Sequence, residues 1–99
     1  ALVDVFVIDV TGGDSARDLT AELRAGGLSA DRSFDGRSMK AQIKAADRSG
    51  ARLALVVGDQ ELTDGTVGVR DLRTREQESV PRTDIVPAVQ ARLETERST

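Results

Sequence analysis

Four basic side chains recur at helical spacing in the segment GRSMKAQIKAADRSG, residues 36–50. At roughly 100° per residue, Lys44 and Arg48 fall within about 20° of Arg37, and Lys40 lies about 60° to one side. The opposite face of this predicted helix is apolar, with Met39, Ile43 and Ala46. A stripe of one charge sign suits the phosphate backbone of a nucleic acid, although an idle solvated helix face explains the same pattern.

Glu61 and Arg70 are a second pair of residues that could contact a nucleic acid. Glu61 follows the apolar run ARLALVV, and Arg70 lies in the run TVGVRDL. A carboxylate can accept hydrogen bonds from guanine or cytosine, and an arginine can donate two to guanine. A single-stranded RNA loop exposes these base edges. A plainer interpretation makes Glu61 a turn residue and Arg70 the cross-strand partner of Glu78.

Catalysis and metal binding find little support in the residue types. The chain has no histidine, cysteine or tyrosine, and its 17 acidic residues form no Asp-rich metal loop. The turn TGGD, residues 11–14, matches neither common phosphate-binding glycine pattern. Two glycines making a tight turn explain it, and Asp14 would repel a phosphate. We therefore expect no catalytic residue and no metal site in this chain.

The totals describe one small domain, residues 1–99. A net charge of -3 argues against a protein that coats nucleic acid generally, but it allows a local basic patch. No apolar run reaches the ~18 residues of a membrane span, and the lack of cysteine fits a cytoplasmic protein. The chain begins without methionine and enters a strand-like run at once. We therefore expect a domain cut from a longer chain, with the missing part N-terminal.

Hydrophobic patterning predicts five strands, at residues 2–10, 28–32, 51–57, 66–72 and 75–80. Three helices are predicted, one capped by Asp14 or Ser15, one over residues 37–49, and one capped by Thr83 or Asp84. Residues 58–65 are predicted to form a compact turn. The predicted fold class is α/β, a five-stranded mixed sheet flanked by three helices. Three strands are parallel because helices connect them, and a C-terminal antiparallel hairpin completes the sheet.

Three motifs follow one another between residues 34 and 81. They are Gly36-Arg37-Ser38-Met39-Lys40-Ala41-Gln42 with Ala46-Asp47 and Gly50-Ala51, then Gly58 with Glu61, then Val67-Gly68-Val69-Arg70-Asp71-Leu72 with Glu76-Gln77. In type, order and spacing they resemble the anticodon-binding domain of class II aminoacyl-tRNA synthetases. Within that group they look most like the C-terminal domain of the histidyl-tRNA synthetases. Arg75 stands where the family motif has glycine, so the resemblance does not predict the geometry of that turn.

The resemblance implies a fold of the anticodon-binding-domain type and a role in tRNA recognition. The domain would dock on the anticodon stem-loop of a histidine tRNA, with no DNA and no membrane as partner. By the same resemblance, Glu61 and Arg70 would contact anticodon bases. The residues implied in contacting or supporting the RNA backbone are Arg37, Lys40, Gln42 and Lys44.

Catalysis would belong to a separate domain of the parent chain. By resemblance, that domain would use ATP and Mg to form histidyl-tRNA, and the parent enzyme would be a homodimer. The anticodon-binding domain itself would need no cofactor. An alternative is a regulatory synthetase-like paralogue, whose domain makes protein–protein contacts without tRNA charging. A stand-alone small-molecule-binding domain is a third option, but no phosphate loop supports it.

Overall fold

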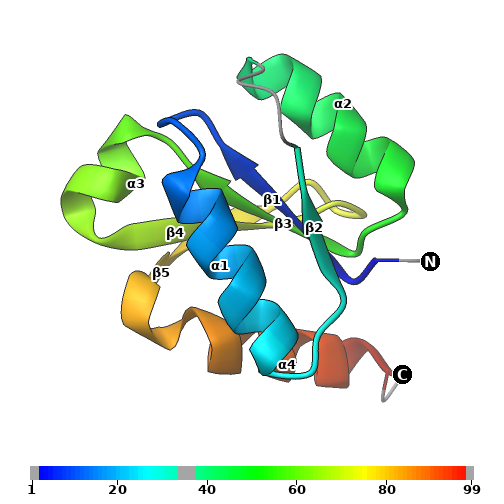
Figure 1. Cartoon of the computed structure of the whole chain (residues 1–99). Coiled ribbons are helices and arrows are strands. Elements are labelled where there is room, and N and C mark those ends of the chain that lie inside the picture. Colours follow the sequence, from blue (N-terminus) through cyan, green and yellow to red (C-terminus); the bar gives the residue numbers. More distant parts are fainter. Residues whose placement is uncertain (1–2, 34–37, 98–99) are drawn as a thin grey trace.

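The sheet has five strands. Figure 1 shows their arrangement in the computed structural model, which describes residues 3–33 and 38–97. The strands are β1 (Val5–Asp9), β2 (Ala30–Arg32), β3 (Leu53–Val57), β4 (Thr66–Asp71) and β5 (Gln77–Pro81). Their order in the sheet is β2-β1-β3-β4-β5. β1 is parallel to β2 and β3, whereas β4 is antiparallel to both β3 and β5. The predicted mixed sheet, with three parallel strands and an antiparallel hairpin, is confirmed.

The helices differ from the prediction in number. In the described part of the chain they are α1 (Asp14–Ala25), α2 (Met39–Ser49), α3 (Asp59–Asp64) and α4 (Ile85–Arg97), with a 3-10 turn η1 (Arg82–Asp84) before α4. The predicted compact turn at 58–65 contains helix α3, so the prediction of three helices was wrong by one. α3 has six residues and buries none of them, and hydrophobic periodicity therefore gives no signal for it. None of the helices in residues 3–33 and 38–97 combines the length and apolar character that crossing a membrane requires.

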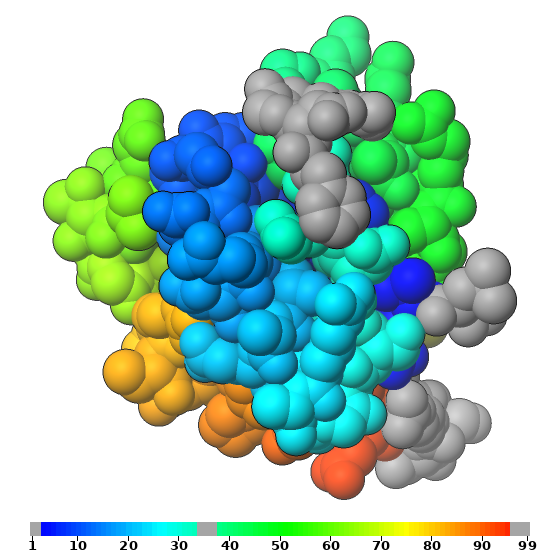
Figure 2. Space-filling view, viewed as in Figure 1, coloured from blue at the N-terminus to red at the C-terminus, as the bar shows by residue number. Residues whose placement is uncertain are grey.

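The two faces of the sheet carry different helices. On one face, α1 and α4 pack on Val5, Val7, Leu53, Leu55, Val67 and Val69. On the other face, α2 packs on Phe6, Ile8, Ala54 and Val56. This alternation follows from the pleat, which turns successive side chains to opposite sides. Figure 2 shows α1 in the middle of one surface of the molecule, with α3 to one side and α2 to the other.

The second apolar cluster covers β1 and β3 and includes no residue of β4 or β5. The side chains that β4 and β5 turn toward the α2 face follow from the strand register. We call these six residues the open strip: Thr66, Gly68 and Arg70 of β4, and Gln77, Ser79 and Pro81 of β5. All three β5 members are exposed. The face that α2 covers is therefore only partly closed.

Candidate nucleic-acid interface

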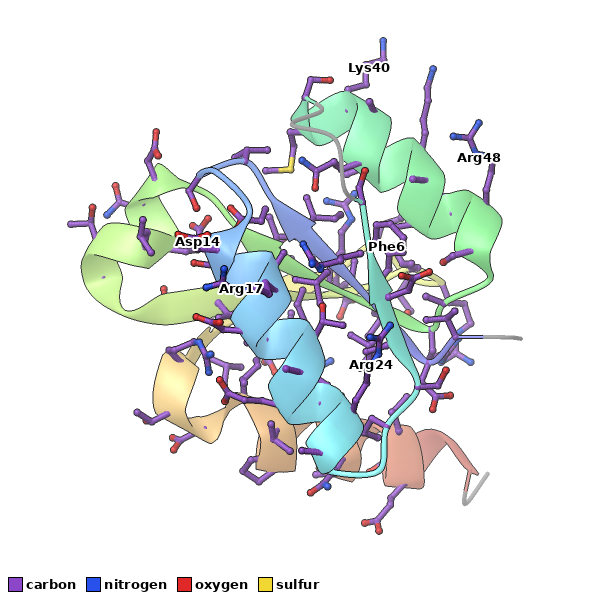
Figure 3. All side chains as sticks on the ribbon, in the orientation of Figure 1. Phe6, Asp14, Arg17, Arg24, Lys40 and Arg48 are labelled. Carbon is purple, nitrogen blue, oxygen red and sulfur yellow. The ribbon has the colours of Figure 1, made fainter. Side chains whose placement is uncertain are left out.

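Helix α2 begins and ends with well-formed caps. The Ser38 hydroxyl accepts a hydrogen bond from the Ala41 N–H at 3.2 Å, and Gly50 ends the helix in the left-handed region, with φ of 76°. Lys40, Lys44 and Arg48 are exposed, and Figure 3 shows Lys40 and Arg48 pointing away from the sheet. Three members of the predicted basic stripe thus face outward. The fourth, Arg37, lies outside the described residues.

Gln42 is buried between α2 and the end of β1, with 2% of its surface exposed. Its side-chain oxygen accepts from the Asp9 N–H and its Nε2 donates to the Asp9 carbonyl, both at 2.9 Å. β2 pairs with β1 only as far as Val7, so the Gln42 amide takes the place of a missing strand residue. This burial is at odds with a direct Gln42 contact to RNA. Its supporting role, through the position of α2, stays a prediction.

Glu61 lies at the carboxyl end of β3, in the first turn of α3. Its Oε1 accepts a hydrogen bond from the Gly58 N–H at 2.7 Å and so caps the helix. A Cβ atom on Gly58 would lie 2.9 Å from that oxygen and 3.9 Å from the exposed Val10 side chain. Side chains alternate between the two faces of the sheet, and those of Ala54 and Val56 face α2. By this alternation, a Cβ atom on Gly58 would also point to the α2 face. The Glu61 carboxylate is therefore next to the same face as the open strip.

Arg70 lies inside the open strip. It pairs with Ala54 on β3 and with Gln77 on β5, whereas Glu78 is opposite Val69 and binds Arg92 of α4. The plainer interpretation of Arg70 as the cross-strand partner of Glu78 was therefore wrong, because the two side chains leave the sheet on opposite faces. The Arg70 Nε is shielded from solvent and has no hydrogen-bond acceptor in the described chain. Its guanidinium is thus not committed to an internal partner.

The structure brings Glu61 and Arg70 to one face without joining them. No hydrogen bond or ion pair connects them among the residues that the structure describes. Arg70 pairs with Ala54 of β3, and Gly58 follows Ala54 by four residues. The pair formed by Val56 and Gly68 lies between the two positions. Four strand residues span about 13 Å. A carboxylate and a guanidinium therefore stand at the two ends of a short stretch of open sheet.

The hairpin turn keeps the geometry that a glycine would adopt. Arg75 has φ of 70°, in the left-handed region, and its N–H donates to the Asp71 carbonyl at 2.8 Å. The Asp71 carboxylate accepts from the N–H groups of Arg73 and Thr74. The Arg75 guanidinium pairs with Asp47 on α2 at 2.9 Å. Arg75 therefore adopts a left-handed backbone conformation that a glycine would adopt more readily.

Sequence reasoning missed Asp9, at the end of β1. Its carboxylate accepts from the Thr11 hydroxyl and N–H and from the N–H groups of Gly13 and Ala16. Asp9 thus caps α1 in place of the predicted Asp14 or Ser15, since Gly13 is the N-cap residue and makes no side-chain hydrogen bond. Burial raises the pKa of the Asp9 carboxyl, but the hydrogen bonds from Thr11, Ala16 and Gly13 outweigh it and lower the pKa. The sequence did offer a signal for this cap, because Asp9 is an acidic residue at the end of a buried strand, just before a glycine-containing turn.

Residues 3–33 and 38–97 hold no group of three histidine, cysteine, aspartate or glutamate side chains that could bind a metal ion. The positive and polar groups near the α2 face can instead bind by hydrogen bonding and charge.

Comparison with known proteins shows which family this chain resembles. The family model described as "Anticodon binding domain" matches residues 4–92. The chain is 41% identical over 97 residues to a histidine–tRNA ligase of Nocardia farcinica, covering 94% of this chain and 22% of that protein. It is 49% identical over 75 residues to the one of Rhodococcus jostii, covering 76% and 18%. The chain thus spans about a fifth of the length of these curated relatives.

Solved structures agree with this result. The apo histidyl-tRNA synthetase of S. aureus superposes with a TM-score of 0.80 at 32% identity, covering 88% of this chain and 23% of that one. The RNA binding domain of threonyl-tRNA synthetase from Cryptosporidium parvum also has a TM-score of 0.80, at 17% identity, covering 92% and 24%. The second likeness shows a shared fold.

Proposed function

The chain belongs to the anticodon-binding domain family, and on this premise we propose that it binds the anticodon stem-loop of a histidine tRNA. It would do so as the accessory domain of a histidine–tRNA ligase, the activity named for the relatives in Nocardia and Rhodococcus. A catalytic domain elsewhere in the parent chain would use ATP and Mg. The parent enzyme would work as a homodimer in the cytoplasm.

The observation that carries this proposal is the uncommitted Arg70 guanidinium on the uncovered half of the sheet. An arginine Nε that is shielded from solvent and has no internal acceptor is costly. The Arg70 side chain as a whole is only partly buried, so the exposed part of its guanidinium can still donate to a ligand. Arg70 can donate to the acceptor edge of a base, and Glu61 can accept from a donor edge. Lys40 and Lys44 of α2 would contact phosphates, which position the RNA without selecting its sequence.

The test is a titration of the labelled chain with the anticodon stem-loop of a histidine tRNA, followed by NMR. We expect the amide signals near Glu61 and Arg70 to shift. The variant Arg70→Ala should lose discrimination at one anticodon base, by roughly 10-fold, while binding of stem-loops altered at other bases changes uniformly. Signals near both residues that stay unmoved up to millimolar RNA would contradict the proposal.

A further inference from the structure

Gln77 and Gly68 form the middle of the open strip. They lie on neighbouring strands and are diagonal neighbours on the same face, two rungs apart, since Gln77 pairs with Arg70 and Gly68 pairs with Ser79. Gly68 is buried and Gln77 is exposed. The described helices place no apolar side chain over this part of the sheet.

The Gln77 side chain lies across Gly68. A Cβ atom added to Gly68 would be 2.5 Å from the Gln77 Nε2 and 3.2 Å from its Cδ. The backbone of Gly68 does not have the left-handed φ that favours glycine. The missing side chain of Gly68 therefore leaves the space in which the Gln77 amide lies close to the sheet, and a methyl group there would move the amide away.

The amide and the neighbouring guanidinium complement each other chemically. The amide offers both donors and an acceptor, whereas the guanidinium offers donors only. Among the described residues the Gln77 amide has no hydrogen-bond partner, and the Arg70 Nε has none either. Two side chains that lie side by side on a flat surface with unused polar groups can meet the edge of one planar ligand.

The positive charges on this side of the sheet favour a nucleic acid as that ligand. Arg70 is the one charged residue of the strip, and α2, which covers the other half of the same face, carries the exposed Lys40 and Lys44. An unpaired base presents donors and acceptors at its edge and carries its negative phosphate beside them. Glutamine is among the side chains that read base edges through two hydrogen bonds.

We propose that Gln77, seated over Gly68, is a specificity-determining residue that hydrogen-bonds one unpaired base of the stem-loop beside Arg70. The inference rests on the proposed function and adds to it a second side chain that reads sequence. Gly68 acts through Gln77 and is a positioning residue. The two residues should therefore behave as one unit when substituted.

The experiment measures Kd for the histidine-tRNA anticodon stem-loop and for stem-loops with each anticodon base replaced in turn. Gln77→Ala should lose roughly 10-fold of the discrimination at one base, with the salt dependence of binding unchanged. Gly68→Ala should reproduce this loss, because its methyl group displaces the amide. The double variant should lose no more than Gln77→Ala alone.

Gln90→Ala is the matched control. Gln90 is also a glutamine on the surface, but it lies on α4 and its Nε2 donates to the Gly26 carbonyl. Its loss should leave discrimination intact. Circular dichroism of each variant confirms that it is folded before binding is compared.

The outcomes separate this inference from the proposed function. If the unaltered chain discriminates among stem-loops while Gln77→Ala and Gly68→Ala discriminate as well, the assignment of Gln77 is overturned and the proposed function stands. If the unaltered chain binds no stem-loop, both are overturned. Loss at one base in Gln77→Ala, with Gln90→Ala unaffected, supports the assignment.

Discussion

Asp9 shows how one residue can hold two elements in place. Its backbone is bonded by the Gln42 amide of α2, and its carboxylate caps α1. The N-terminal N–H groups of a helix need acceptors, and a carboxylate near them also interacts favourably with the helix dipole. The position of both helices on the sheet therefore depends on this strand end.

We predict that Asp9→Asn lowers the free energy of unfolding by about 2 kcal/mol, since an amide has one acceptor oxygen for four donated hydrogen bonds. The folded-state pKa of Asp9 is lowered, so its stabilisation is present above the unfolded pKa of about 3.9 and is lost as pH falls through the folded pKa. Urea unfolding of both proteins between about pH 6 and pH 3 measures this.

The difference between Asp9→Asn and the unaltered protein should shrink as the pH falls. Both proteins should still lose stability in acid, because the pKa values of Glu22 and Asp71 are lowered too: Glu22 by its hydrogen bonds with Arg82, and Asp71, against the raising effect of burial, by backbone hydrogen bonds. A difference that stays constant to pH 3 would show that the charge of Asp9 is not responsible.

At the scale of single residues, sequence chemistry predicted which residue types could contact RNA but not where their side chains lie in the fold. Glu61 and Arg70 were chosen because a carboxylate and an arginine suit base edges, and that assignment stays a prediction. The burial of Gln42 could not be predicted from the sequence, because its hydrogen-bond partner Asp9 is 33 positions away. Long-range pairing of this kind depends on how α2 lies on the sheet, which local patterns do not contain.

Among the elements, the β4–β5 turn carries a measurable strain. Arg75 adopts φ of 70°, a region that costs a residue with a side chain roughly 1 kcal/mol or more. Its ion pair with Asp47 of α2 is partly exposed, and such pairs contribute little. The turn thus keeps a shape that glycine would adopt without cost.

We expect Arg75→Gly to raise the free energy of unfolding by about 0.5 kcal/mol, the relief of strain less the small ion-pair loss. Arg75→Ala is the control, since it loses the same ion pair and keeps the strain, and it should be less stable than the unaltered protein. Thermal unfolding of the three proteins decides this. An Arg75→Gly protein no more stable than Arg75→Ala would exclude strain at this turn.

Elements with a strong apolar pattern were predictable, whereas α3, which has no such pattern, was missed. β1 and β3 are buried along their whole length, and their continuous apolar runs are typical of central strands. α3 buries no residue and is stabilised at its start by Glu61. Its formation depends on a cap and on the following Gly65, which periodicity does not register.

For the whole molecule, net charge and local charge differ in sign. The chain carries -3 overall, yet the open strip and the outer face of α2 offer Arg70, Lys40 and Lys44. On α1, by contrast, Arg17 is engaged by Asp14 and Asp18, and Figure 3 shows Arg17 beside Asp14. An approaching RNA should thus meet attraction on the α2 side of the sheet and near-neutral or negative surface on the α1 side.

This asymmetry predicts that Lys44→Ala weakens stem-loop binding to all sequences alike, whereas Arg17→Ala has little effect. Each lost phosphate contact removes about 0.7–0.9 from the slope of log K against log salt concentration. Lys44→Ala should therefore lower that slope by this amount and leave base discrimination unchanged, in contrast to Arg70→Ala. Binding measured at several salt concentrations provides both quantities. If Arg17→Ala lowered the slope as much as Lys44→Ala, the RNA would not be confined to the α2 side, and binding would reflect the total charge alone.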